Sequence, residues 1–319
     1  MSRLKTIFCG TPEFSVPVLE TLKNNSDIEL YAVVSMPDRP AGRGKKLTTP
    51  EVAQYAKDHN LKLIQTENIN REEAFLKEAG DQGVDLIIVL AFAQFLGSKM
   101  LELPKHGCFN IHTSLLPKYR GAAPIQYALL NGDKQTGVSI QKMVKKMDAG
   151  DLVHSSQVKI GEDTTGGELY DLLKKEAAIS IEPFIKSLIE GTITYTKQDE
   201  TQVSLAPTLK KNDGFIDFKN QKVDVIFNQV RALKPWPGTF CFLNNKRLKV
   251  INIKKESSSL KAGELSIQFN TLLVGCLDGA LRLTEVQLEG KKACTDTQLL
   301  NGLNNKNEEF QINPKGGLS

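Results

Sequence analysis

The sequence is poor in residues that crosslink a chain or bind metals. Its five cysteines are an odd number, lie far apart and contain no CxxC pair, which argues against a disulfide framework and against structural zinc. Its four histidines have no partners at ligand spacing, so we expect no metal. A reducing compartment suits such a chain, and we expect it in the cytoplasm.

Long apolar runs are also absent. No stretch approaches the roughly 18 apolar residues that a membrane span requires, and the basic start of the chain is not followed by an apolar run of signal-peptide length. The glycine pattern G-x-G-x-x-G is missing too, because the first apolar strand is followed by Gly10-Thr11-Pro12. These absences argue against a membrane protein and against an NAD-dependent dehydrogenase.

What the chain does have is the composition of an ordinary globular protein. With 319 residues, 40% of them hydrophobic and 24% charged, it is longer than one hydrophobic core usually serves, and we expect two domains. Its first half alternates short apolar runs with helical patterns, which is typical of a Rossmann-like, doubly wound, mostly parallel α/β sheet. The expected strands cover residues 4–9, 29–34, 61–64, 84–90, 108–113, 137–143 and 152–159.

A polar segment without periodicity, residues 195–213, indicates a linker between the domains. It contains Pro207, and we place the boundary near Ala206, which gives domains 1–206 and 207–319. After the linker, one helical pattern and several short strands predict a small OB-like β-barrel.

The second domain carries the basic surplus of the chain. Residues 208–319 hold 17 Lys and Arg against 11 Asp and Glu, whereas residues 1–207 hold 24 against 26. Such a surplus attracts a polyanion, but a solvated basic surface has the same composition. Charge alone therefore leaves nucleic acid as one interpretation of two.

The strand predicted at residues 108–113 carries two polar side chains on one face. Asn110 and His112 project to the same side, near the carboxyl edge where open α/β sheets bind ligands. An amide and an imidazole can both donate hydrogen bonds to an oxygen that becomes negative during acyl transfer. Alone, an Asn-x-His pair is more often a structural strand end, so the interpretation depends on the residues around it.

A carboxylate that can act with His112 lies in a predicted turn at residues 147–151. Asp148 could orient His112, favour its protonated form, or accept protons from an attacking amine through water. Asp151 offers the same chemistry, and spacing does not choose between the two.

Several motifs together resemble a known family. In order along the chain they are Asn110-x-His112, Ser114-Leu115-Leu116-Pro117, Arg120-Gly121 and Asp148-x-Gly150-Asp151. This set is similar to that of the 10-formyltetrahydrofolate-dependent formyltransferases. Residues 37–46, 233–239 and 286–292 resemble the members of that family that act on a charged tRNA, and the resemblance covers nearly the whole chain.

The resemblance implies a reaction and its catalytic residues. The chain would transfer a formyl group from 10-formyltetrahydrofolate to the α-amine of methionyl initiator tRNA, for translation initiation. Asn110, His112 and Asp148 would be the catalytic residues. We expect a monomer that binds the tRNA and the reduced folate.

The resemblance also implies where the folate binds. Its contacts would be Phe92 and the run Ser114, Leu115, Leu116 and Pro117, with the pterin slot completed by residues 89–97 and 145–148. The family usually has a Tyr-Gly pair after the strand that ends near Leu90. This chain departs from it, because Phe92 keeps the ring but Ala93 replaces the glycine.

The basic loop within residues 37–46 would reach the acceptor arm of the tRNA. A segment with cations and glycines is suited to following phosphates and to entering beside an unpaired end, although a solvated surface loop has the same composition. The tRNA-binding candidates are Arg39, Arg43, Lys45 and Lys46.

Two other functions suit parts of the sequence and differ from the first in what they require. A folate-dependent formyltransferase acting on a small amine, such as a purine precursor or an amino sugar nucleotide, would need neither the basic loop nor the residues after Pro207. A non-catalytic RNA-binding module would have lost one of Asn110, His112 or Asp148, and all three are present.

Overall fold

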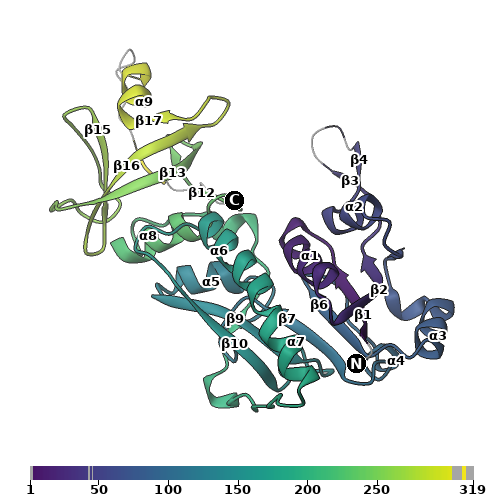
Figure 1. The fold of residues 1–319 in the computed structure, drawn as a ribbon. Coiled ribbons are helices and arrows are strands. Elements are labelled where there is room, and N and C mark those ends of the chain that lie inside the picture. The colour runs from purple at the N-terminus through teal and green to yellow at the C-terminus, as the bar shows by residue number, and fades with distance from the viewer. Residues whose placement is uncertain (1–2, 42–43, 45, 304–310, 314–319) are drawn as a thin grey trace. The chain divides into compact units, whose positions relative to one another are not determined.

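The computed structural model describes residues 3–41, 44, 46–303 and 311–313. The chain forms two compact units, which the ribbon colours of Figure 1 help to follow. The first unit contains residues 1–124, 135–159 and 170–206, and the second contains residues 125–134, 160–169 and 207–319.

A mostly parallel seven-stranded sheet forms the centre of the first unit, in the order β10-β9-β7-β6-β1-β2-β5. The last five of these strands pair in parallel, whereas β9 pairs antiparallel with both β7 and β10. The Rossmann-like sheet predicted from the sequence is confirmed. The strands are β1 (Leu4–Gly10), β2 (Ile28–Ser35), β5 (Leu63–Gln65), β6 (Leu86–Leu90), β7 (Gly107–His112), β9 (Gln135–Lys142) and β10 (Leu152–Lys159).

Helices cover both faces of this sheet (Figure 1), which is why its central strands are apolar on both sides. On one face, Ile7 of β1 clusters with Phe75 of α3 and Met100 of α4. On the other, the rings of Phe109 on β7 and Phe184 on α7 lie 4.9 Å apart. The helices of the first unit are η1 (Glu13–Ser15), α1 (Val16–Asn24), α2 (Glu51–Asp58), η2 (Ile69–Arg71), α3 (Glu73–Asp81), α4 (Ser98–Leu101), most of α6 (Gly166–Ile179), α7 (Ile181–Ile189) and η3 (Glu200–Gln202), whereas α5 (Pro124–Leu130) lies almost wholly in the second unit.

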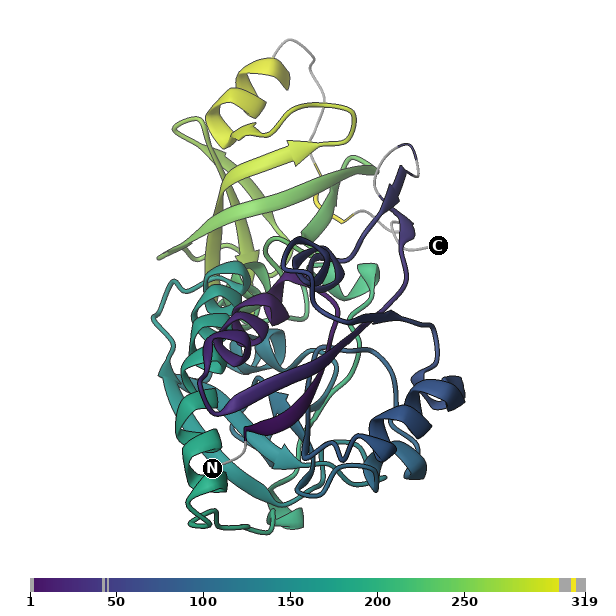
Figure 2. The ribbon, with the colours of Figure 1, turned by 45° about the vertical axis from the view of Figure 1, so that its right-hand side comes forward.

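Two short ladders lie outside the large sheet. The first pairs β3 (Arg39–Ala41) antiparallel with β4 (Lys46–Thr48), as a hairpin that follows β2 (Figure 2). The second pairs β8 (Arg120–Gly121) in parallel with β11 (Leu205–Ala206). The second ladder brings the segment that leads out of the first unit beside the loop that follows β7.

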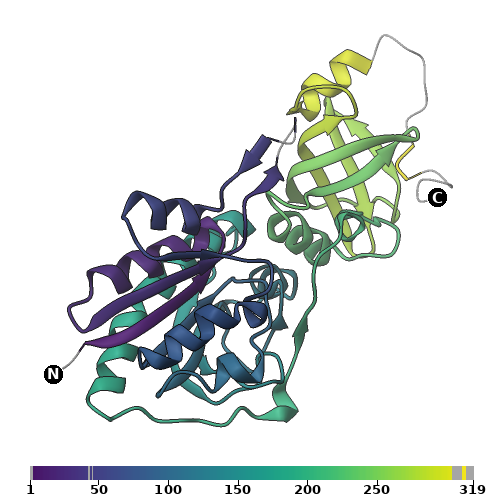
Figure 3. The same cartoon turned by 90° about the vertical axis from the view of Figure 1, so that its right-hand side faces the viewer.

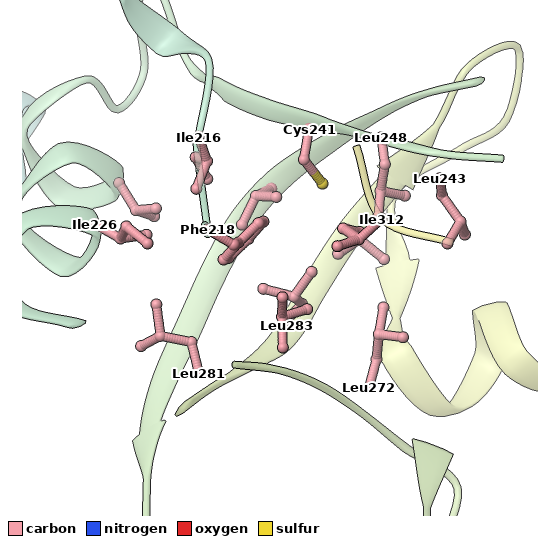
Figure 4. Packing of buried hydrophobic residues seen from close by; sticks show 14 of the residues in the cluster. Ile216, Phe218, Ile226, Cys241, Leu243, Leu248, Leu272, Leu281, Leu283 and Ile312 are labelled. Carbon is pink, nitrogen blue, oxygen red and sulfur yellow. The ribbon is translucent and has the colours of Figure 1, made fainter. Parts of the chain in front are cut away.

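The second unit is built on an antiparallel sheet, in the order β12-β13-β16-β15-β14 with β17 paired to β16 (Figure 3). Side chains such as Phe218, Cys241 and Leu283 form its core together with Ile226 of α8 (Figure 4). The antiparallel C-terminal domain predicted from the sequence is confirmed. Its elements are η4 (Lys211–Gly214), α8 (Val223–Ala232), β12 (Thr239–Leu243), β13 (Lys246–Glu256), β14 (Leu265–Gln268), β15 (Thr271–Cys276), β16 (Gly279–Leu288), β17 (Cys294–Thr295) and α9 (Asp296–Leu303).

Candidate active site

Strand β7 presents Asn110 and His112 to a turn between β9 and β10 that carries Asp148. Nδ2 of Asn110 lies 3.4 Å from Oδ1 of Asp148, and Nδ1 of His112 lies 3.8 Å from the same oxygen. The side chains of His112 and Asp148 are 7% and 11% exposed. The three residues selected from the sequence therefore form one cluster that is largely withdrawn from water.

A hydrogen bond on the far side of the His112 ring fixes its tautomer. Nε2 lies 2.8 Å from the carbonyl oxygen of Tyr119, and because a carbonyl can only accept, Nε2 carries the hydrogen. The backbone N–H of Tyr119 in turn donates to Oγ of Ser204 at 2.9 Å. Nδ1 is therefore the ring nitrogen that can gain or lose a proton, and it is the one that faces Asp148.

The carboxylate of Asp148 is surrounded by N–H donors. Nε2 of Gln141 donates to Oδ1 at 3.0 Å, and the backbone N–H of Gly121 donates to Oδ2 at 2.9 Å. Gly121 has a φ of 124°, and a Cβ at this position would lie 2.7 Å from the carbonyl oxygen of Ala206. Glycine allows both the backbone conformation and the close approach that this hydrogen bond needs.

The turn around Asp148 decides which of its two aspartates meets His112. Asp148 has a φ of 50°, in the left-handed region. Gly150 lies against β9 so closely that a Cβ there would be 1.6 Å from the carbonyl oxygen of Lys142. The backbone of Asp151 instead continues into the sheet, where its carbonyl accepts the N–H of Lys142 at 2.9 Å. The geometry thus brings Asp148, rather than Asp151, to the histidine.

Residues outside the predicted catalytic set complete the surroundings of this cluster. Gln141 contacts the carboxylate directly, and Gln198 contacts the backbone of the turn. The buried guanidinium of Arg120 lies 2.7 Å from Glu200, which Lys146 also contacts at 2.8 Å. Hydrogen bonds from these two cations lower the pKa of Glu200 to about 2. Arg120 stood out in the sequence as part of an Arg-Gly pair, whereas Gln198 lies in the predicted linker, where no periodicity marks it.

The loop expected to contact the folate is fixed by its own hydrogen bonds. The hydroxyl of Ser114 donates to the Lys118 carbonyl at 2.6 Å. The hydroxyl of Ser139 on β9 donates to the Ser114 carbonyl and accepts the N–H of Leu116. The Leu116–Pro117 peptide bond is cis. Ser114 and Leu116 are buried, whereas Leu115 and Pro117 are partly exposed.

The segment after β6 exposes the ring of Phe95 instead of that of Phe92. Phe92 is 2% exposed and belongs to the hydrophobic cluster beneath α3, while Phe95 is 70% exposed. Ala91 and Ala93 both adopt left-handed backbone, with φ of 49° and 61°. The departure from the glycine of the family thus places alanine in a conformation that favours glycine. Phe92 packs in this cluster and anchors the segment after β6. Its contact with folate stays a prediction.

Two of the four tRNA-binding candidates lie in the hairpin of β3 and β4. Arg39 pairs across the ladder with Thr48, and its exposed guanidinium lies 3.5 Å from Glu67. Lys46 is exposed at the start of β4. Arg43 and Lys45 lie outside the described residues.

Among the described residues, no group of three or more His, Cys, Asp or Glu side chains is arranged to hold a metal ion. No helix of this described part is long and apolar enough to cross a membrane. Cys108, two residues before Asn110 on β7, is buried, and desolvation raises its pKa to about 12, so it remains a neutral thiol.

The chain matches two family models and has relatives of similar length. The models are described as "Formyl transferase", matched over residues 3–182, and "Formyl transferase, C-terminal domain", matched over residues 208–304. The methionyl-tRNA formyltransferase of Geobacter sulfurreducens is 40% identical over 303 residues, which are 95% of this chain and 95% of that protein. That of Bacillus licheniformis is 42% identical over 293 residues, 90% of this chain and 92% of that protein.

Solved structures share the fold at lower identity. The N-formyltransferase from Helicobacter canadensis, solved with folinic acid and dTDP-3-aminofucose, has a TM-score of 0.66 at 21% identity and covers 88% of this chain and 98% of its own. The sugar 3N-formyl transferase WlaRD has a TM-score of 0.65 at 21% identity over 92% and 100% of the two chains. These likenesses concern the fold alone. Through the family models and the relatives at 40% identity or more, the chain belongs to the formyl transferase family and, within it, to the methionyl-tRNA formyltransferases.

Proposed function

We propose that the chain transfers the formyl group of 10-formyltetrahydrofolate to the α-amine of methionyl initiator tRNA, for translation initiation, as a cytoplasmic monomer. One observation carries the proposal. Oδ1 of Asp148 faces both the amide nitrogen of Asn110 and the free ring nitrogen of His112, in a site largely withdrawn from water. The relatives described above carry the name of this activity.

The reaction joins the amine nitrogen to the formyl carbon and breaks the bond from that carbon to N10 of the folate. The amine loses a proton and N10 gains one, so the transfer consumes no net proton. Between these events the formyl oxygen carries a negative charge. Asn110 uses one amide hydrogen toward Asp148 and can donate the other to this oxyanion. One such donor is typically worth about 3 kcal/mol.

His112 and Asp148 supply the second donor and the proton acceptor. A protonated Nδ1 of His112 donates to the oxyanion, with the carboxylate of Asp148 3.8 Å away. Nε2 is engaged with the Tyr119 carbonyl, so proton exchange on the ring takes place at Nδ1. Asp148 accepts the amine proton through water, and the binding of both substrates in line supplies proximity.

The reduced folate would lie against the loop at residues 114–117 and the segments that follow β6 and β9. These last two segments expose large apolar side chains, namely Phe95, Val144 and Met147. Exposed apolar groups beside convergent polar ones are what a flat heterocycle such as a pterin covers when it binds.

The tRNA would contact the basic hairpin and the C-terminal domain, which we assign to residues 207–319. In the hairpin we assign the contacts to Arg39, Arg43, Lys45 and Lys46. The cationic surplus of the C-terminal domain suits the backbone of a polyanion.

The test is a formylation assay with matched acceptors. Purified protein is incubated with 10-formyltetrahydrofolate and charged initiator methionyl-tRNA, and formyl-methionine is measured after deacylation. Elongator methionyl-tRNA, free methionine and an amino sugar nucleotide serve as controls. We expect formylation confined to the initiator tRNA. Formylation of the amino sugar nucleotide instead would assign the chain to the small-amine formyltransferases.

A further inference from the structure

Gln198 bridges two backbone carbonyls of the catalytic turn. Its Nε2 donates to the carbonyl of Asp148 at 2.9 Å and to that of Gly150 at 2.8 Å. One carbonyl belongs to Asp148, whose backbone is left-handed with φ of 50°, and the other lies two residues later in the same turn. The amide of Gln198 thus acts on the backbone that aims the catalytic carboxylate, without touching the carboxylate itself.

The orientation of this amide is fixed by its other end. Oε1 of Gln198 accepts from Nε of Arg120 at 3.1 Å and from Nη2 at 2.8 Å. A guanidinium only donates and a carbonyl only accepts, so the side chain has one satisfactory orientation. Arg120 is 5% exposed and is also held by Glu200 at 2.7 Å. Nε2 of Gln198 also lies 3.4 Å from Oε1 of Gln141, so five hydrogen bonds define where Gln198 lies.

The segment that carries Gln198 also contacts the two residues whose backbones bind His112 and Asp148, namely Tyr119 and Gly121. Ser204 accepts the N–H of Tyr119, whose carbonyl binds Nε2 of His112. The ladder of β8 and β11 holds Gly121, whose N–H binds Oδ2 of Asp148. One stretch of chain just before the second domain thus fixes both orienting contacts of the His112–Asp148 pair.

We propose that Gln198 is a positioning residue for formyl transfer, which keeps Asp148 aimed at Asn110 and His112. This inference rests on the proposed function. Without the amide, two carbonyls lose their donor and the left-handed turn loses the contact that stabilises it. Because displacement of a reacting group by about 1 Å can cost on the order of 100-fold in rate, we expect a large effect on kcat.

The test compares Gln198→Met with Gln202→Met. Methionine has a similar length and donates no hydrogen bond. Gln202 lies exposed on the same segment, where its amide donates to Oδ2 of Asp199 at 2.9 Å. We expect kcat of Gln198→Met to fall about 10- to 100-fold. We expect both KM values to change less than about threefold, because the residue acts on the transition state. Gln202→Met should behave as the unsubstituted chain.

A double variant separates positioning from a general structural role. If Gln198 acts through Asp148, adding Gln198→Met to Asp148→Ala should lower kcat no further. An equal loss in both backgrounds would overturn the inference, as would an unchanged kcat in the single variant. If Gln198→Met fails to fold, Gln198→Glu replaces it, since it keeps the shape and removes the donor at neutral pH.

The same assay distinguishes failure of the inference from failure of the proposed function. Unsubstituted protein that formylates a small amine but no tRNA refutes the proposed acceptor, and the Gln198 comparison is then made with that amine. Unsubstituted protein that folds, binds folate and transfers formyl to none of these acceptors refutes both.

Discussion

Nδ1 of His112 lies 3.8 Å from Oδ1 of Asp148. This contact joins a strand of the parallel sheet to a turn that the chain reaches only after the antiparallel strand β9. Each partner is held from its other side, the imidazole by the Tyr119 carbonyl and the carboxylate by the Gly121 N–H. The pair is therefore set by the loop after β7 as much as by the elements that carry it.

Removal of either proposed oxyanion donor should reduce the rate without unfolding the protein. We expect His112→Ala and Asn110→Ala each to lower kcat by about 100- to 1,000-fold, as loss of one preorganised donor typically does. The measurement is single-turnover formylation, with circular dichroism to verify the fold. His106→Ala provides the control, because His106 is exposed just before β7. A folded His112→Ala variant with normal turnover would remove His112 from the mechanism.

Gly121→Ala should damage both stability and rate. The new Cβ would meet the Ala206 carbonyl oxygen at 2.7 Å in a backbone with φ of 124°. Such strain typically costs about 1–3 kcal/mol, and the backbone shift draws the N–H away from Asp148. Denaturant unfolding measures the first effect and kcat the second.

Gly191→Ala is the matched control for this substitution. Gly191 also has a positive φ, 66°, but no atom lies within 4 Å of its hypothetical Cβ. It should cost about 1 kcal/mol from the left-handed backbone alone and leave kcat unchanged. Equal effects of the two substitutions on kcat would mean that the contact of Gly121 with Asp148 is unimportant.

The strands of the parallel sheet could be predicted from the sequence because each strand is marked by its own run of apolar residues. The parallel strands are continuous apolar runs, and β7 also showed Asn110 and His112 as polar residues on one face. Boundaries and breaks were less accurate. Residues 165–189 have one continuous helical pattern in the sequence, but they form two helices that meet at Ser180, whose buried hydroxyl pairs with that of Ser156 on β10. That contact depends on tertiary packing.

The residues that surround Asp148 could not be predicted from local sequence patterns. Gln141 meets Asp148 because of its register on β9, where it pairs with Asn110, and register is not visible in a single sequence. Gln198 lies in a polar segment whose fold depends on distant partners, chiefly Arg120. The choice between Asp148 and Asp151 likewise needed the left-handed turn.

Glu200→Gln should lower stability in a pH-dependent way. Arg120 first, and then Lys146, hold the pKa of Glu200 at about 2, below its ordinary value of 4.5. Between these pH values the unfolded chain binds a proton that the folded chain does not. The stabilisation is therefore complete above about pH 4.5 and is lost as the pH falls toward 2.

Melting temperatures of the unsubstituted protein and of Glu200→Gln at pH 7, 5, 4 and 3 check this dependence. The difference between them should stay constant from pH 7 to 5 and shrink at pH 4 and 3. Glu190→Gln is the control, because its ion pair with Lys186 is long, 3.9 Å, and exposed at both ends. A difference that grows on acidification would contradict the assigned sign.

Arg39→Ala should weaken tRNA binding while leaving the chemistry intact. Arg39 is exposed on the hairpin, and its contact with Glu67 at 3.5 Å joins two exposed side chains, so its loss should cost little stability. Loss of one phosphate contact reduces the salt dependence of binding by about one unit of slope. We expect KM for the tRNA to rise about 3- to 10-fold at low salt, with KM for the folate and kcat unchanged.

Lys77→Ala is the control, since Lys77 pairs with Asp81 on the surface of α3. Equal KM values for Arg39→Ala and Lys77→Ala would exclude Arg39 from the tRNA contact.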